Sequence, residues 1–184
     1  MQNKFKTLLA VAAFSLVIAS CKKNKEEVNA NEVITTVQLQ LTPVGGGTML
    51  TYKWEDLDGA GGSSPVIDII TLAPGKTYNT EIVIFDKTKN PTVVTSDEVR
   101  KEAIDHRFYF EPAAGSNITV SGLDNDPNGI PLGLKSVWTT GAASTGSIKI
   151  TLRHYENGGK ALADLINSTK SSTDAETMFS TKIQ

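Results

Sequence analysis

The sequence of 184 residues contains a single cysteine, Cys21, and only two histidines. One cysteine cannot form a disulfide within the chain, and it cannot build the cysteine clusters of structural zinc sites. Every catalytic triad would have to use His106 or His154, and neither lies in a recognisable catalytic motif. The chain also lacks an H-E-x-x-H motif, a G-x-S-x-G elbow and a phosphate-binding glycine loop. The sequence therefore predicts a protein that is not an enzyme.

The charged residues show no excess of basic side chains. The 18 lysines and arginines are balanced by 20 aspartates and glutamates, which gives a net charge of −2. A nucleic-acid-binding domain normally carries a basic patch, and this sequence has no basic cluster. We therefore expect no nucleic-acid partner.

After the first 20 residues, no apolar segment approaches the roughly 20 residues that a helix needs to span a bilayer.

The first 20 residues have the layout of a bacterial export signal. Lys4 and Lys6 precede an apolar run of roughly a dozen residues, which suits the core of a signal peptide and is too short to span a bilayer. The run ends in the sequence L-V-I-A-S-C at residues 16–21, which resembles the lipobox of bacterial lipoproteins. The resemblance implies cleavage before Cys21, a diacylglycerol thioether on its sulfur and an acyl chain such as palmitate on its amine. The alternatives are an ordinary signal peptide with a chance cysteine and an uncleaved anchor.

The sequence divides into three parts. Residues 1–20 are the predicted lipoprotein signal peptide. Residues 21–31 are polar and charged without an apolar period, as expected of a flexible tether. Residues 32–184 carry a regular apolar pattern, and their length suits one domain with its own hydrophobic core. Two or more acyl chains on Cys21 would hold this domain stably on a membrane.

Alternation of apolar and polar residues dominates residues 32–184 and is typical of half-buried strands. Strands are predicted over residues 33–41, 50–55, 66–72, 78–86, 107–112, 118–122, 132–140, 146–154 and 177–183. The segment 66–72 is uniformly apolar and is predicted to be a central strand, and residues 140–146 are predicted to be a hairpin loop. Short strands with frequent turn signals predict an all-β fold, an antiparallel two-sheet β-sandwich of the immunoglobulin-like or Greek-key type. A small barrel is the rival architecture.

One segment departs from the strand pattern. Residues 95–98, T-S-D-E, match a capping box in which Thr95 is the N-cap and Glu98 reaches back to it. Val99 and Ala103 then follow at helical spacing. The sequence therefore predicts one short helix over residues 95–105.

Both histidines share the parity of the apolar residues in their predicted strands. His106 starts its strand and His154 ends its own, so the two rings would meet if these strands run antiparallel side by side. Glu102 and Asp105 lie nearby in the sequence and would supply oxygen ligands. The four residues therefore form a candidate transition-metal site, because imidazole and carboxylate groups are common ligands of such ions. The alternative is a pair of hydrogen-bonded structural histidines.

Two acidic loops have the spacing of calcium sites. The candidate ligands are Asp124, Asp126 and Asn128 in one loop and Asp56 and Asp58 in the other. Alternate oxygen-bearing side chains on a tight turn converge on one point. An EF-hand is excluded, because Lys135 stands where the bidentate glutamate belongs and no helix precedes the loop. The alternative is a pair of loops whose Asp and Asn side chains bind their own backbone.

Aromatic residues offer a third kind of site, a platform on which a sugar would stack. Tyr52 and Trp54 share the inward parity of their strand, which favours a place in the core. Tyr109 and Tyr155 are the better surface candidates.

Several segments carry a resemblance to known proteins. They are E-V-I-T-T-V at residues 32–37, W-E-D-L-D-G at 54–59, L-x-P-G-x-T-Y at 72–78, E-A-I-D-H-R-F-Y-F at 102–110 and T-G-A-A-S-T-G-S-I-K-I-T-L-R-H at 140–154. Their strand and turn pattern resembles small outer-membrane lipoproteins of Gram-negative bacteria that are encoded beside TonB-dependent receptors, a group without an established activity. The resemblance implies an outer-membrane anchor and an accessory role beside an uptake receptor.

We therefore expect a lipid-anchored binding or accessory lipoprotein of the cell envelope that works with an outer-membrane uptake receptor. One alternative is an independent surface lipoprotein that binds calcium, a transition metal or a glycan. A structural component of a surface coat is the other. The sequence leaves open whether the domain lies on the periplasmic or the outer face of the membrane.

Overall fold

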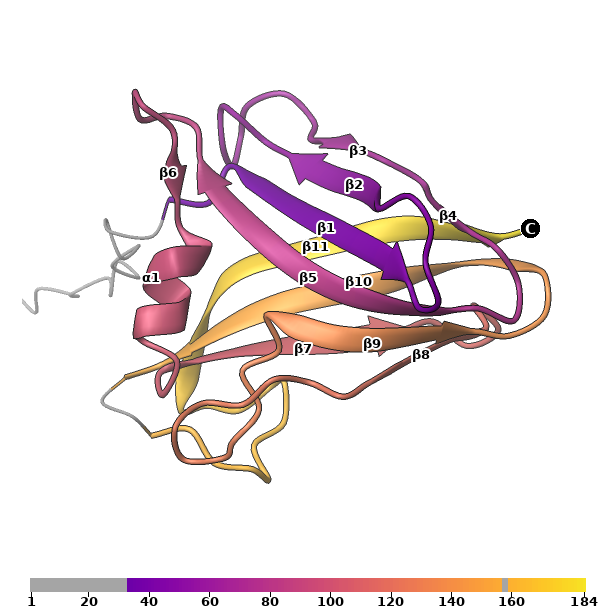
Figure 1. Cartoon of the computed structure of the whole chain (residues 1–184). Coiled ribbons are helices and arrows are strands. Elements are labelled where there is room, and N and C mark those ends of the chain that lie inside the picture. The colour runs from indigo at the N-terminus through magenta and orange to yellow at the C-terminus, as the bar shows by residue number, and fades with distance from the viewer. Residues whose placement is uncertain (1–32, 157–158) are drawn as a thin grey trace, which may run out of the picture. The chain divides into compact units, whose positions relative to one another are not determined.

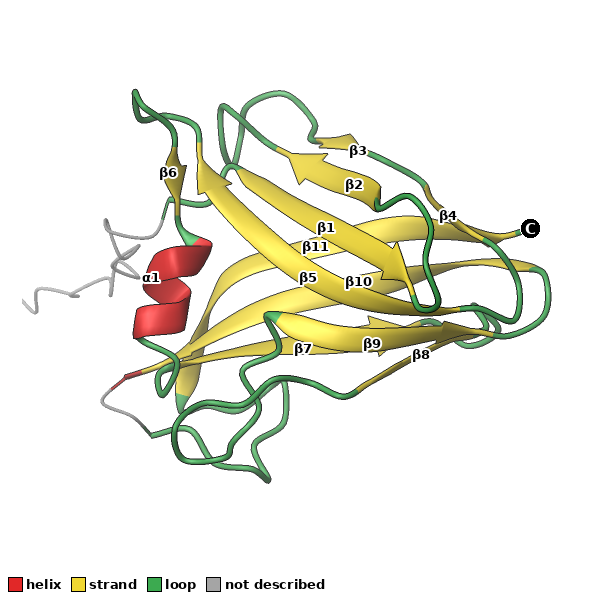
Figure 2. Ribbon diagram, viewed as in Figure 1, coloured by secondary structure: helices red, strands yellow, loops and turns green. Residues whose placement is uncertain are grey.

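The computed structural model describes residues 33–156 and 159–184 (Figure 1). The predicted signal peptide, Cys21 and the predicted tether lie outside the described residues. Within these ranges, no helix has both the length and the apolar character to cross a membrane. The described residues form two β-sheets that pack face to face, with one short helix at one end (Figure 2). The predicted all-β, two-sheet architecture is thus confirmed.

The larger sheet has seven strands. In spatial order they are β3 (Val66–Ile67), β2 (Leu50–Glu55), β1 (Thr36–Pro43), β5 (Thr77–Asp86), β9 (Lys135–Thr140) and β8 (Ile118–Ser121), and β6 (Val93–Val94) pairs with β5 off this path. All neighbouring pairs in this sheet run antiparallel. The alternation in β1 places Val37, Leu39 and Leu41 in the core, as the period-two pattern predicts.

The smaller sheet has four strands. In spatial order they are β4 (Ile70–Leu72), β11 (Ser171–Ile183), β10 (Ser144–Tyr155) and β7 (His106–Pro112). The pairs β11–β10 and β10–β7 are antiparallel, whereas β4 runs parallel to β11. The second sheet is therefore mixed rather than purely antiparallel. Its core face includes Phe108, Ile150 and Phe179, which are all buried.

The segment predicted as one central strand over residues 66–72 is split between the two sheets. Asp68 causes the break: its N–H donates to the carbonyl of Lys53, and its carboxylate accepts from the N–H of Lys53, each at 2.9 Å. These bonds hold the chain at the end of β3, and it then crosses to the other sheet as β4. Val66 and Ile67 remain exposed. The prediction of a central strand was wrong, because an apolar run alone does not distinguish an edge from a centre.

The predicted hairpin loop at residues 140–146 is also wrong. It connects β9 in the larger sheet to β10 in the smaller one, so the two strands are not paired with each other. The small residues serve close packing at this crossing. A Cβ at Gly146 would lie 2.9 Å from Cα of Ser116, so only glycine fits there.

The helix α1 (Ser96–Lys101) is shorter than predicted. Thr95 has helical backbone angles (φ −64°, ψ −27°), and its side chain makes no capping hydrogen bond. A capping side chain needs an extended backbone at this position, so the predicted capping box does not form. Val99 and Ala103 are buried against the core as expected. The turn after α1 leads directly to His106, the first residue of β7.

Candidate functional site

The two histidines face each other at the end of the smaller sheet. His106 in β7 and His154 in β10 are direct partners in the antiparallel ladder. Their ring centroids lie 4.6 Å apart, and the ring planes are tilted by 36°. The predicted approach of the two rings is confirmed. It follows from parity and strand order alone, because residues that start one strand and end its antiparallel neighbour stand opposite each other.

A β-bulge brings a third candidate ligand to the histidines. Leu152 of β10 pairs with Ala175 of β11, but the next residue, Arg153, pairs with Thr173. Asp174 is therefore the extra residue of the bulge. In a regular strand it would share the outward parity of Glu176, and a bulge can re-aim such a side chain. The carboxylate of Asp174 instead lies against both imidazole rings.

The three side chains offer two nitrogen ligands and one oxygen ligand at close range. Nε2 of His106 lies 3.6 Å from Oδ2 of Asp174, and Nδ1 of His154 lies 3.9 Å from Oδ1. One ligand atom from each residue falls within 4.8 Å of the others. Among the described residues, this is the group of His, Cys, Asp and Glu side chains placed to hold a metal ion. We call it the His–His–Asp cluster.

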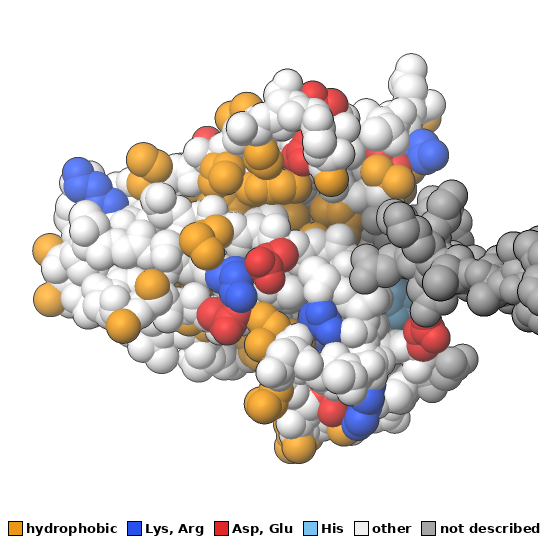
Figure 3. Space-filling model, turned by 180° about the vertical axis from the view of Figure 1, so that it is seen from behind, with side chains coloured by type: hydrophobic (Ala, Val, Ile, Leu, Met, Phe, Trp, Pro, Cys, Tyr) orange, Lys and Arg blue, Asp and Glu red, His pale blue; other side chains and the backbone are white. Residues whose placement is uncertain are grey.

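The His–His–Asp cluster is mostly enclosed but has one accessible side. The side chain of His106 is 0% exposed and that of Asp174 is 8% exposed, whereas that of His154 is 17% exposed. A small area of histidine side chain is visible on the surface in Figure 3. An ion that enters the cluster would therefore approach from the side of His154.

The turn before β7 fixes the tautomer of His106. Its Nδ1 lies 3.0 Å from the carbonyl oxygen of Glu102. A carbonyl only accepts, so Nδ1 carries the hydrogen and donates it. The hydrogen bond at Nδ1 leaves Nε2, which lies 3.6 Å from Oδ2 of Asp174, as the ligand atom of the ring, an arrangement common among metal-binding histidines.

The group of side chains placed to hold a metal ion includes neither of the two predicted oxygen ligands, Glu102 and Asp105. Glu102 is exposed and contributes only its backbone carbonyl, which holds the ring of His106. Asp105 accepts the N–H of Tyr155 at its backbone carbonyl, at 2.6 Å. The carboxylate in the cluster is that of Asp174, which the sequence analysis missed. Its position in a bulge leaves no periodic signal by which it could have been found.

The buried ammonium group of Lys160 lies against the backbone of His106. Nζ of Lys160 donates to the carbonyl oxygens of Ala103 at 2.7 Å, His106 at 2.8 Å and Pro131 at 3.2 Å. It also lies 3.0 Å from Oδ2 of Asp126, and both of these side chains are 1% exposed. Burial lowers the pKa of Lys160, although the Asp126 carboxylate opposes this shift. The fold thus encloses a charged pair whose ammonium group also hydrogen-bonds to three backbone carbonyls.

The first predicted calcium loop is held together by its own carboxylates. Oδ1 of Asp126 accepts from the N–H groups of Asn128 and Ile130, at 2.8 and 2.9 Å. Burial raises the pKa of Asp126, but these N–H groups and Lys160 outweigh that effect and hold the pKa below its usual value. Oδ1 of Asp124 accepts from the N–H of Lys135 at 2.9 Å. These bonds favour the alternative of Asx-type turns over a calcium site.

The second predicted calcium loop has the same character. Oδ1 of Asp56 accepts from the N–H of Gly59, and Oδ2 of Asp58 accepts from the N–H of Ser63. The bond from Ser63 holds the pKa of Asp58 below its usual value. This loop joins β2 to β3, whereas the first lies between β8 and β9, at the opposite edge of the larger sheet (Figure 1). The two loops therefore do not form a shared site.

The aromatic residues do not form an exposed platform. Trp138 and Tyr155 are completely buried, so the prediction that Tyr155 lies on the surface was wrong. The hydroxyl of Tyr109 lies 2.6 Å from that of Tyr155 and donates to the carbonyl of Asp164. Cζ of Arg107 lies over the ring of Tyr109, 4.6 Å from the ring centroid. Burial raises the pKa of Tyr109 well above its usual value. These residues fasten the segment before β11 to the outer face of the smaller sheet.

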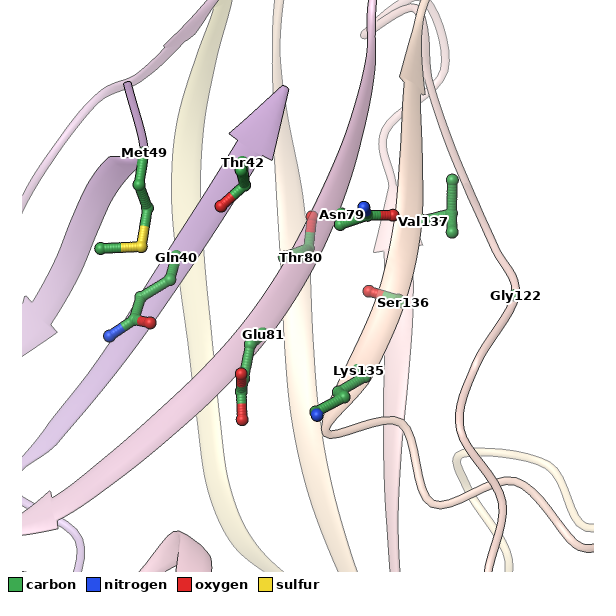
Figure 4. Close-up of a pocket in the computed structure, with 10 residues that line it drawn as sticks. All are labelled: Gln40, Thr42, Met49, Asn79, Thr80, Glu81, Gly122, Lys135, Ser136 and Val137. Atoms are coloured by element: carbon green, nitrogen blue, oxygen red, sulfur yellow. The ribbon is translucent and has the colours of Figure 1, made fainter. Parts of the chain in front are cut away.

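A shallow hollow lies on the outer face of the larger sheet (Figure 4). Its volume is about 410 Å³, and it is lined by Gln40, Thr42, Met49, Asn79, Thr80, Glu81, Gly122, Lys135, Ser136 and Val137. Glu81 pairs with Arg100 at 3.4 Å. The lining contains no aromatic ring on which a sugar would stack. The hollow therefore offers less specific chemistry than the His–His–Asp cluster.

No protein-family model, curated protein or solved structure matches this chain. The functional assignment accordingly rests on the sequence and on the geometry of the His–His–Asp cluster.

Proposed function

We propose that this protein is a lipid-anchored lipoprotein of the cell envelope that binds a divalent transition metal at His106, His154 and Asp174. The observation that carries the proposal is the convergence of these three side chains, from three strands, within 4.8 Å. The bulge in β11 turns the carboxylate of Asp174 onto both imidazole rings, which places one oxygen ligand beside two nitrogen ligands. In a metal site, all three side chains would act as ligands of one ion.

Zinc is the ion that fits the ligand set best. Two imidazole nitrogens and one carboxylate oxygen form a common zinc site, with bonds of about 2.0–2.2 Å. In a tetrahedral site with such bonds, neighbouring ligand atoms lie about 3.3 Å apart. The observed contacts, 3.6 Å from His106 to Oδ2 of Asp174 and 3.9 Å from His154 to Oδ1, and the 4.8 Å within which all three ligand atoms lie, exceed this spacing. The three side chains would therefore move inward on binding the ion. Calcium and magnesium prefer sites made only of oxygen atoms and fit less well.

The cellular role follows from the sequence features outside the described residues. The lipobox-like segment ending at Cys21 supports anchoring by acyl chains, and residues 21–31 supply a short tether. The resemblance to lipoproteins encoded beside TonB-dependent receptors supports a partner in outer-membrane uptake. The domain is then an immunoglobulin-like sandwich of the Greek-key type. Its role would be to carry metal to or from such a receptor. Its three protein ligands leave a fourth position through which an ion could be exchanged.

Calorimetric titration of the protein with zinc tests the metal assignment. The lipidated protein, extracted from membranes in detergent, should bind one zinc ion per chain. The His106→Ala/His154→Ala variant should lose this binding by about 100-fold or more, since two of three ligands are removed. Glu176→Ala is the matched control, because this carboxylate lies on the same strand as Asp174 but is exposed. Equal binding by the histidine variant and the control would refute the assignment.

Affinity purification tests the partner. The lipidated protein, tagged at its C-terminus and extracted with its native membrane, should copurify with a TonB-dependent receptor identified by mass spectrometry. Retention of the receptor should not depend on the Glu176→Ala change. Recovery of the protein as an ordered self-assembled layer, with no receptor, would favour the surface-coat alternative instead.

A further inference from the structure

The buried pair of Lys160 and Asp126 has no role of its own in the proposed metal site, yet it lies against the backbone of His106. We propose that this pair positions His106 for metal binding, an inference that rests on the proposed function. The hydrogen bond from Lys160 to His106 is made at the backbone carbonyl. The pair acts through the peptide groups that carry the imidazole ring.

The contacts of Lys160 surround the turn that leads into β7. Its ammonium group donates to the carbonyls of Ala103 and His106, at the two ends of this turn. The ring of His106 is bonded to the carbonyl of Glu102 one residue earlier. Lys160 thus holds the backbone of His106 and the same turn to which the ring of His106 is hydrogen-bonded. A shift of His106 along its strand would break both bonds to the ammonium group.

The same ammonium group ties this turn to two other parts of the fold. Lys160 belongs to the segment between β10 and β11, which contribute His154 and Asp174. Asp126 and Pro131, which also contact Nζ, belong to the connection between β8 and β9. One charged group therefore fixes the distance between the strand that carries His106 and the neighbouring connections. This geometry would hold the three ligands in register.

Stability alone does not explain the pair. Removing a charged pair from water costs about as much as the attraction between the charges returns, and an apolar replacement of both partners is often neutral. In some proteins such a pair fixes one arrangement among several. Here the arrangement fixed is the backbone at a ligand. Residues that orient metal ligands typically change metal affinity by about 10–100-fold when they are replaced.

The test compares zinc affinity and cobalt spectra in matched variants. Lys160→Met/Asp126→Asn removes both charges, and asparagine keeps the oxygen that accepts from Asn128 and Ile130. The control is Thr140→Val, which removes a buried hydroxyl bonded to the carbonyl of Ala73 at 2.7 Å, at the opposite end of β9 from the Lys135 loop. Both variants lose buried hydrogen bonds, but only the first touches the backbone of His106.

We expect the double variant to bind zinc about 10–100-fold more weakly than the wild type and to change the visible spectrum of bound Co²⁺. The control should keep both the affinity and the spectrum. If the double variant binds within twofold of the wild type with an unchanged cobalt spectrum, the inference is overturned while metal binding stands. If the wild type itself binds no zinc, the proposed function falls and the inference falls with it.

A measurement on the unchanged protein covers the case in which the double variant fails to fold. The ¹⁵N resonance of the Lys160 ammonium group should shift when zinc is added, because this group donates to the backbone carbonyl of His106, whose ring would bind the ion. The resonances of exposed lysines such as Lys76 should stay in place. A Lys160 resonance that does not respond to saturating zinc would overturn the inference.

Discussion

Nε2 of His106 and Oδ2 of Asp174 lie 3.6 Å apart, although β7 and β11 are not neighbouring strands. The strand β10 runs between them, and it supplies His154 as the third member of the cluster. The approach of a histidine and a carboxylate across an intervening strand depends on the bulge in β11.

Asp174→Asn should weaken zinc binding by about 100-fold, because the amide is a neutral and poorer ligand than the carboxylate. The fold should be preserved, since asparagine has nearly the same shape. Competition with a coloured zinc chelator measures the affinity. An affinity within threefold of that of the wild type would show that Asp174 does not bind the ion.

Zinc should stabilise the folded protein. At a free zinc concentration of 100 times the dissociation constant, linkage adds about 2.7 kcal/mol to the free energy of unfolding. For a domain of this size, that corresponds to a rise of about 5–10 °C in the melting temperature. Calorimetry with and without a chelator measures the shift. His106→Ala/His154→Ala should show none, and a shift of equal size in that variant would place the ion elsewhere.

Lys160→Met alone should destabilise the fold by about 3–5 kcal/mol, because it leaves the buried carboxylate of Asp126 without its charged partner. Lys160→Met/Asp126→Asn should lose less, since neither charge then stays buried. Urea unfolding of the two variants and the wild type gives the comparison. The account of a coupled buried pair fails if the single variant is the more stable of the two.

The pH dependence of stability should include a contribution from Asp126. Its folded-state pKa is lowered, so the unfolded chain binds more protons as the pH falls. The stabilisation is therefore present above about pH 4, the ordinary value for aspartate, and is lost as the pH falls through the folded-state pKa. Urea unfolding between pH 2.5 and 6 should show a shallower acid loss in Asp126→Asn. Identical profiles in the wild type and the variant would contradict this contribution.

Cys21→Ser should release the protein from the membrane fraction, because the acyl chains would have no sulfur to which they attach. Fractionation of cells, followed by mass spectrometry of the N-terminus, measures both the location and the modification. A Cys21→Ser protein that still sediments with membranes would contradict lipid anchoring.

Period and parity predicted much of the fold and two of the three residues of the cluster. The alternation in β1 and β5 predicted two strands within a few residues of their bounds. The parity of His106 and His154, together with their places at opposite ends of neighbouring strands, predicted their meeting. These features depend on local periodicity, which a sequence displays directly.

The rest depended on interactions that local patterns do not encode. Asp68 divides an apolar run between two sheets through two bonds to Lys53, a residue from another strand. Asp174 reaches the histidines only because β11 carries an extra residue opposite β10. Lys160 was not singled out from the sequence, yet the fold buries it against the backbone of His106. Each of these requires the long-range pairing to be known first.

Zinc K-edge X-ray absorption on the zinc-loaded protein tests the central claim most directly. The account predicts about four nitrogen or oxygen neighbours at about 2.0–2.1 Å, with the outer-shell scattering of two imidazole rings that disappears in the His106→Ala/His154→Ala variant. A shell made only of oxygen atoms, without imidazole scattering, would contradict the His–His–Asp cluster as a metal site.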